Sequence, residues 1–299
     1  MKFYLCDGGS HHKNRTAIRQ MMEANGATYT EHTNLNAIDD SYDVALCMTQ
    51  FFPPSAFPAR CKVVYGPQFF VFPDNMSHPI HKHTYDPDRF FFNILSDWVK
   101  KVYIHKAPRL SLRFITCPLG LDLDNIQEVP PLLERQKVMI YFKHRHPSAL
   151  DAVRQFLEAK GQEYVVISYG SYNDADFKAK LKESRFVIWV GSHESQGFAF
   201  QETQASNIPI LLWDVHSMRD EYNGSWPYGQ SSGQPDELAA TTATCWSDDC
   251  GIKFYRGEDL ASTYDEMCLK LETFRPRAFI TDKLSLTATY ERLVTTIGL

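Results

Sequence analysis

The sequence has little of what marks several large classes of protein. It contains no C-x-x-C pair, and its seven cysteines are scattered, which argues against a disulfide framework or a zinc site. No apolar run approaches the ~20 residues of a membrane-spanning helix. Basic residues are not in excess, because the formal net charge is −5, so no overall field attracts nucleic acid. We expect no metal, no nucleic-acid partner and no transmembrane segment.

Two sequence signals are also missing. The chain starts with a strand-like segment at 2–6, without the charged start and longer apolar core of a signal peptide. We therefore expect a cytoplasmic protein, with peripheral membrane contact left open. The first glycine turn does not follow the G-x-G-x-x-G pattern, which disfavours nicotinamide binding, and we expect no cofactor.

What the chain does contain is an alternation of β-rich apolar runs and amphipathic helices. With 299 residues, 43% of them hydrophobic, it is long enough for two domains with separate cores. The alternation predicts α/β architecture with parallel sheets. We expect one domain over 1–128, a proline-containing linker, a second domain over 136–275, and a helix over 276–299. The expected strands are 3–6, 42–48, 62–65, 113–117, 137–142, 164–168, 186–190, 208–213 and 250–254, and the expected helices are 14–24, 95–103, 147–160, 174–183, 198 to about 207, and 258–271.

The stretch over 185–214 carries most of the functional signal. It reads as a buried strand, a small-residue loop, a helix that starts near Gly197, and a second buried strand. Glu194 falls in the loop, and Glu202 falls about one and a half turns inside the helix. The free N–H groups at a helix start favour an anion, while carboxylates accept hydrogen bonds from sugar hydroxyls. The pattern predicts a site for a nucleotide sugar.

A basic segment begins the second domain. Lys143, His144, Arg145 and His146 follow the expected strand 137–142. Lysine supplies a point charge and arginine a two-pronged donor, so Lys143 and Arg145 suit a diphosphate. A basic turn facing solvent remains the alternative for this segment taken alone. Further along, Tyr169 offers a ring on which a nucleotide base could stack.

These segments together resemble a known family. The run Glu194-Ser195-Gln196-Gly197-Phe198, followed by Glu202 and later by Asn207-Ile208-Pro209, resembles the signature of retaining, family-4-type glycosyltransferases (glycosyl transferases group 1). It departs from that signature at Ser195, Gln196 and Gln201. Pro118-Leu119-Gly120-Leu121-Asp122 resembles the passage with which such enzymes leave their first domain. The resemblance implies a GT-B fold: two Rossmann-like domains whose parallel sheets face across a cleft, with a C-terminal helix that crosses back to the first domain.

The resemblance also implies a reaction and a set of site residues. The reaction is transfer of a sugar from a UDP-, GDP- or ADP-sugar to a glycan or other hydroxyl acceptor, with retention of configuration and without a metal. The residues expected to act in catalysis are Glu194, Lys143 and Arg145. The donor is expected to bind at Ser195, Gln196, Gly197, Phe198, Glu202, Tyr169 and Gly170, and the acceptor side is expected at Gly8, Gly9, His12, Gln68 and His78.

Several alternatives stay open at the level of sequence. Asp122 and Asp124 have the D-x-D spacing that holds Mn²⁺ or Mg²⁺ in the other major glycosyltransferase fold. The histidines near position 80 suggest metal only weakly, because they lack a helical spacing and a partner cluster. An inverting transferase or a sugar phosphorylase would use the same scaffold. A non-catalytic sugar- or nucleotide-binding module is the alternative of a different class, favoured by the short first domain and the long aperiodic segment over 218–249.

Overall fold

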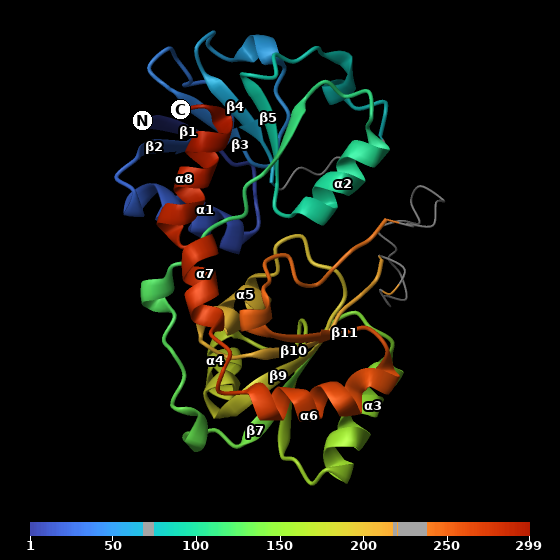
Figure 1. The fold of residues 1–299 in the computed structure, drawn as a ribbon. Helices are drawn as coiled ribbons and strands as arrows, with labels where there is room; N and C mark the ends of the chain where they lie inside the picture. The colour runs from blue at the N-terminus through green and yellow to red at the C-terminus, as the bar shows by residue number, and fades with distance from the viewer. Residues whose placement is uncertain (68–74, 218–219, 221–237) are drawn as a thin grey trace. The chain divides into compact units, whose positions relative to one another are not determined.

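The chain forms two compact α/β units. The computed structural model describes residues 1–67, 75–217, 220 and 238–299 (Figure 1). Unit 1 comprises Met1–Asp122 together with Leu284–Leu299, and unit 2 comprises Leu123–Lys283. Of the predicted features, Gln68 and most of the 218–249 segment lie outside the described residues. None of the helices in the described parts of the chain is long and apolar enough to span a bilayer.

Unit 1 is built on a six-stranded parallel sheet. The strand order is β2-β1-β3-β4-β5-β6, and every neighbouring pair is parallel. The strands are β1 (Lys2–Cys6), β2 (Thr28–His32), β3 (Val44–Cys47), β4 (Lys62–Tyr65), β5 (Phe90–Ile94) and β6 (Arg113–Thr116), and the helices between them are α1 (His12–Ala24) and α2 (Asp97–Lys106).

Unit 2 is built on a five-stranded parallel sheet in the order β11-β10-β9-β7-β8. Its strands are β7 (Lys137–Phe142), β8 (Tyr164–Ser168), β9 (Ser184–Val190), β10 (Ile210–Trp213) and β11 (Gly251–Phe254). Its helices are α3 (Pro147–Ala159), α4 (Asp174–Glu183), α5 (Phe198–Ala205), α6 (Leu260–Lys270) and α7 (Pro276–Leu284).

The unit 2 sheet is buried on both faces, which explains why its strands read as continuous apolar runs. Successive side chains of a strand point to opposite faces. Along β7, Val138 and Ile140 accordingly join one core with α3 and α6, while Met139 and Tyr141 join another with α4 and α5. Burial of each side chain of this size stabilises the folded state by roughly 1.5–3 kcal/mol. The sheet is therefore a rigid base for the loops at its edges.

The C-terminal segment returns to unit 1. The single helix predicted over 276–299 was wrong in one respect, because the chain breaks into α7 and α8 (Leu286–Ile297) at Ser285. The Ser285 side chain caps α8 by accepting from the amide of Ala288 at 3.3 Å. α8 packs beside α1 in unit 1, where Asn25 donates to the carbonyl of Leu286 at 3.3 Å (Figure 1). The predicted return of the C-terminal helix to the first domain is confirmed.

Two strands were not predicted. β2, with the sequence Thr-Tyr-Thr-Glu-His, is an edge strand with no buried residue and therefore lacks an apolar pattern. β5 contains Phe90, Phe91 and Phe92, all buried, directly before the cap of α2. A short apolar run next to a helix is ambiguous in period, so no strand was predicted before the helix expected over 95–103.

Candidate functional site

The topology of unit 2 determines where its ligand site should lie. In a parallel sheet all carboxyl ends share one edge, and ligands bind where the strand order reverses. In the order β11-β10-β9-β7-β8 that reversal falls between β7 and β9. Lys143 follows β7 directly, and residues 191–197 follow β9 and lead into α5. We call residues 191–197, which contain Glu194, the glutamate loop. The basic segment and the glutamate loop are about fifty positions apart in sequence, and they meet at this point.

The central contact of the site is an ion pair. The Nζ of Lys143 lies 2.7 Å from Oε1 of Glu194, and each side chain is 14% exposed. The same Nζ lies 4.3 Å from the centroid of the Tyr169 ring. Tyr169 follows β8 and is 51% exposed. The structure thus brings together a cation, a carboxylate and an accessible aromatic face, all three of which were predicted as site residues.

Arg145 is placed differently from Lys143. Its Nη1 donates to the carbonyls of Gly191 at 3.2 Å, Trp213 at 3.3 Å and Asp214 at 3.5 Å. The guanidinium therefore ties together the chain segments that leave β9 and β10. Burial lowers the pKa of Arg145, although the carboxylates of Asp220 and Asp214 oppose this change. Arg145 thus braces the edge of the sheet in addition to carrying charge.

Two histidines at this edge are held toward the neutral form. Burial, followed by the charges of Lys143 and His144, lowers the pKa of His193 to about 4. Burial and the charge of Lys143 also lower the pKa of His144. Because burial, and after it the charge of Lys143, disfavours protonation of both imidazoles, neither histidine supplies positive charge to the site near neutral pH.

The loop after β9 ends in a helix start, as the sequence predicted. Gly197 is the N-cap of α5 and has φ +79°, in the left-handed region that favours glycine. A Cβ at Gly197 would lie 3.3 Å from both Cβ and Cγ of Glu194. Glycine therefore lets the helix start approach the carboxylate closely. Glu202 lies inside α5 and is half-buried, whereas Ser195 is exposed.

Gln196 was predicted to bind the donor, but its side chain is occupied within the protein. It is 2% exposed, and its Nε2 donates to Oε1 of Gln201 at 3.2 Å. Phe198 is the half-buried first residue of α5. Gly170 follows Tyr169 with φ +79°, and a Cβ there would meet no atom within 4 Å.

Asp214 and the segment 240–244 also lie at this edge, and the sequence analysis did not predict them as part of the site. Asp214 follows β10 and is 2% exposed, and its carboxylate accepts hydrogen bonds from the segment 240–244. That segment belongs to the aperiodic region of the sequence. The one sequence signal that could have identified Asp214 is its position: it is a charged residue directly after a buried strand, at the end of the stretch 185–214.

In unit 1, the predicted acceptor-side glycines also lie at a reversal of strand order, between β1 and β3. The amide of Gly8 donates to Oγ1 of Thr49 at 2.9 Å, which joins the two loops. A Cβ at Gly8 would lie 2.3 Å from Nε2 of Gln50. Gly9 has φ +122° and also lies in this turn.

The two predicted acceptor-side histidines lie at separate places in unit 1. His12 is the exposed first residue of α1. His78 caps a 3₁₀ turn by accepting from the amide of Ile80 at 3.2 Å, and its ring lies 5.8 Å from that of Phe51. The acceptor roles of both histidines stay predictions.

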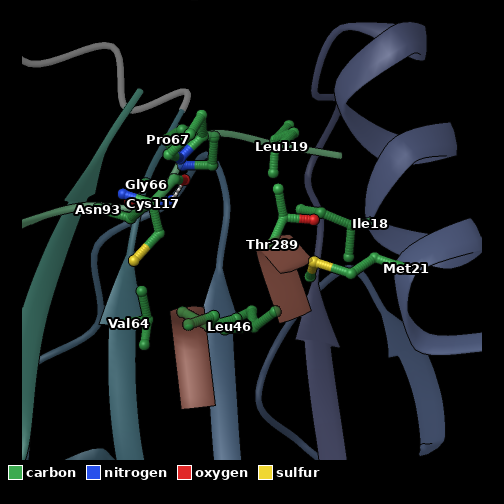
Figure 2. Close-up of a pocket in the computed structure, with 12 residues that line it drawn as sticks. Ile18, Met21, Leu46, Val64, Gly66, Pro67, Asn93, Cys117, Leu119 and Thr289 are labelled. Carbon is green, nitrogen blue, oxygen red and sulfur yellow. Dashed lines mark hydrogen bonds between the residues drawn. The ribbon is translucent and has the colours of Figure 1, made fainter. Parts of the chain in front are cut away.

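A small cavity lies below the carboxyl ends of the unit 1 strands. Figure 2 shows it between Ile18 and Met21 of α1, Leu46 of β3, Val64 of β4, and Thr289 of α8. Its volume is about 20 Å³, which is room for roughly one water molecule. A sugar does not fit in it. In the same region, Nδ2 of Asn93 donates to the carbonyl of Cys117 at 2.9 Å.

Within the described ranges, no three His, Cys, Asp or Glu side chains are grouped closely enough to hold a metal ion. Asp122, one of the two D-x-D residues, accepts a hydrogen bond from Nε2 of Gln20 at 2.8 Å. Asp124 lies in a 3₁₀ turn over Leu123–Asn125.

Comparison with known proteins supports the fold. No protein-family model and no curated protein sequence matches the chain. The structure is similar to AviGT4, a glycosyltransferase involved in avilamycin A biosynthesis, with TM-score 0.53 and 10% identity over 99% of this chain and 97% of that one. It is also similar to sucrose-phosphate synthase from Thermosynechococcus elongatus, with TM-score 0.52 and 9% identity over 99% of this chain and 98% of that one. The GT-B fold with two Rossmann-like α/β units is confirmed.

Proposed function

We propose that the protein is a retaining, metal-independent glycosyltransferase that uses a nucleotide-diphosphate sugar and binds it at the edge of unit 2 formed by β7, β8 and β9. The observation that carries this proposal is the contact of Lys143 with Glu194 at the reversal of strand order, beside the exposed ring of Tyr169. A cation for phosphate, a carboxylate for sugar hydroxyls and a ring for a base are the groups that a nucleotide sugar needs.

In the proposed reaction, donor binding exchanges one partner of the ion pair. The diphosphate takes the place of Glu194 beside Lys143, and the released carboxylate accepts hydrogen bonds from the transferred sugar. The bond between the anomeric carbon and the phosphate oxygen breaks, and its electron pair leaves with the diphosphate. The acceptor hydroxyl bonds to that carbon from the same face, and its proton passes to the leaving phosphate.

The chain stabilises the charge that grows on the leaving group. Lys143, Arg145 and the free amides that start α5 lie on the side of the sheet where the strands end. Cations and amides that are already in position stabilise developing negative charge without reorganisation. Glu202 is proposed to accept hydrogen bonds from the ribose hydroxyls.

The similar structures support the fold on which this proposal is built. Both compared proteins are named for sugar-transfer or synthase activity and share the fold over nearly their whole length. At about one-tenth identity, however, similarity extends to the fold, and function rests on the site itself.

The test is incubation of the protein with a panel of UDP-, GDP- and ADP-sugars, watching for slow release of the nucleoside diphosphate. We expect turnover of at least one donor, with the α or β configuration of the donor retained in the product by NMR. Inversion would show an inverting transferase. Binding of a nucleotide sugar without release of nucleoside diphosphate, with every acceptor tried, would indicate a non-catalytic binding module.

A matched control separates the site from ordinary surface charge. Lys137 begins β7 and pairs with Glu183 at 2.6 Å, so it forms a lysine–glutamate pair at the opposite end of the strand that precedes Lys143. Lys143→Ala should reduce turnover about 10²–10³-fold, the effect of removing one transition-state donor. Lys137→Ala should leave turnover unchanged. Equal turnover in both variants would place the diphosphate elsewhere.

A further inference from the structure

Asp214 and a short run of threonines form a network next to the glutamate loop. The buried carboxylate of Asp214 accepts three hydrogen bonds: from Oγ1 of Thr241 at 2.6 Å, from the amide of Thr242 at 2.8 Å and from the amide of Val215 at 2.9 Å. Nζ of Lys253 lies 3.7 Å from the same carboxylate. We call residues 240–244 the threonine segment. Asp214 holds one end of it against the carboxyl end of β10.

The threonine segment in turn holds the loop that contains Glu194. The amide of Glu194 donates to the carbonyl of Thr241 at 3.1 Å, and Oγ1 of Thr242 donates to the carbonyl of Ser192 at 2.6 Å. Oγ1 of Thr244 donates to the carbonyl of Gln196. Three residues of the loop over 192–196 are thus bonded to three threonines of the threonine segment.

The network is buried enough for these bonds to matter. Asp214 is 2% exposed, and Thr242 and Ser192 are also buried. A buried donor or acceptor that loses its partner carries the full cost of its desolvation. The loop after β9 is therefore held in one position by hydrogen bonds that water does not readily replace.

We infer that Asp214 and Thr241 are positioning residues that hold Glu194 in the orientation required by the nucleotide-sugar site. This inference rests on the proposed function, because it assigns to these two residues the placement of a carboxylate that acts on the donor. Asp214 and Thr241 act through the backbone of the loop. Neither residue is assigned a contact with the donor.

Thr241 allows a sharp test, because its hydroxyl can be removed without changing the size of its side chain. Thr241→Val deletes the donor to Asp214, whereas Thr241→Ser retains the hydroxyl. The Thr241 Oγ1 also accepts from the amide of Ala243 at 3.0 Å, and serine keeps this bond as well. Thr263→Val is the matched control: it removes a hydroxyl that donates to the carbonyl of Asp259 in the region of α6, away from the glutamate loop.

The first measurement is amide hydrogen exchange in the full chain. Thr241→Val should speed exchange of the Glu194 amide by about tenfold. This amide donates to the carbonyl of Thr241, and the variant removes the hydrogen bond that ties Thr241 to Asp214. The amide of Ile188, inside β9, should not change. Thr241→Ser and Thr263→Val should exchange like the wild type at Glu194. Wild-type protection of Glu194 in Thr241→Val overturns the inference.

The second measurement uses the donor that the panel identifies. Thr241→Val should lower kcat/KM by about tenfold, Thr241→Ser should restore it, and Thr263→Val should leave it unchanged. If Thr241 acts through Glu194, the double variant Thr241→Val/Glu194→Gln should be no worse than Glu194→Gln alone. If the fold loss in kcat/KM of the double variant equals the product of the losses of the two single variants, the inference is overturned.

The two measurements also separate this inference from the proposed function. A wild-type protein that turns over no donor contradicts the proposed function, and the exchange comparison then decides by itself whether the Asp214 network holds the loop. Normal turnover in the wild type and in Thr241→Val, together with faster exchange at Glu194, supports the function and overturns the positioning role.

Discussion

Replacing Arg145 with alanine tests whether this residue braces the sheet edge as well as carrying charge. Its Nη1 lies within 3.2–3.5 Å of three carbonyls, on Gly191, Trp213 and Asp214. One Nη carries two protons, so at most two of these bonds are well directed at once. A hydrogen bond from a charged group contributes about 1.5–3 kcal/mol, and the longer distances favour the low end, so we expect a loss of about 2–3 kcal/mol.

For a domain of roughly 150–250 residues, each kcal/mol corresponds to a change in Tm of about 2–4 °C. Arg145→Ala should therefore lower the Tm of unit 2 unfolding by about 4–12 °C in differential scanning calorimetry. Arg145→Lys, which keeps the charge and can reach fewer carbonyls, should fall between wild type and alanine. An unchanged Tm in Arg145→Ala would refute the bracing role.

Three further predictions follow from the site. EDTA should leave turnover largely intact, and a loss that Mn²⁺ restores would instead assign a metal role to Asp122 and Asp124. Glu202→Gln should weaken donor binding by about 1–3 kcal/mol in calorimetry, the scale of hydrogen bonds to a charged group, and unchanged affinity with an intact fold would remove Glu202 from the site. The pKa of His193 is lowered from 6.5 to about 4, so between these values the unfolded chain binds more protons than the folded one. The stability that His193 contributes is therefore full above about pH 6.5 and lost as the pH falls through about 4, and His193→Gln should flatten the rise of unfolding free energy over that window in urea titrations. A slope like that of the wild type would contradict this effect.

The sequence predicted the parts of the fold that depend on local pattern. The buried strands of unit 2 are continuous apolar runs, and the start of α5 at Gly197 requires a residue that tolerates positive φ. Both signals are contained within a few neighbouring residues. The sequence assigned Lys143 and Glu194 to the same site but did not predict the ion pair between them. Both residues follow strands of one parallel sheet, and the loops after such strands lie at the same edge.

The rest of the site depends on long-range packing. Arg145 was interpreted as a diphosphate ligand, and nothing in its neighbours predicts that its Nη1 bonds carbonyls after β9 and β10. Thr241 and Thr242 lie in a segment without periodicity, and their partner Asp214 is 27 and 28 positions away. Such contacts arise from the folded arrangement of loops and leave no pattern of their own in the sequence.

The most direct test of the central claim is to compare binding of each nucleoside with that of its diphosphate by titration calorimetry, using the wild type, Lys143→Ala and Lys137→Ala. If Lys143 receives the diphosphate, one of UDP, GDP and ADP should bind the wild type and Lys137→Ala more tightly than its nucleoside does. That advantage should shrink by about tenfold or more in Lys143→Ala, as for the loss of a charge-assisted bond. A diphosphate advantage that is the same in all three proteins would contradict the placement of the donor at the Lys143–Glu194 pair.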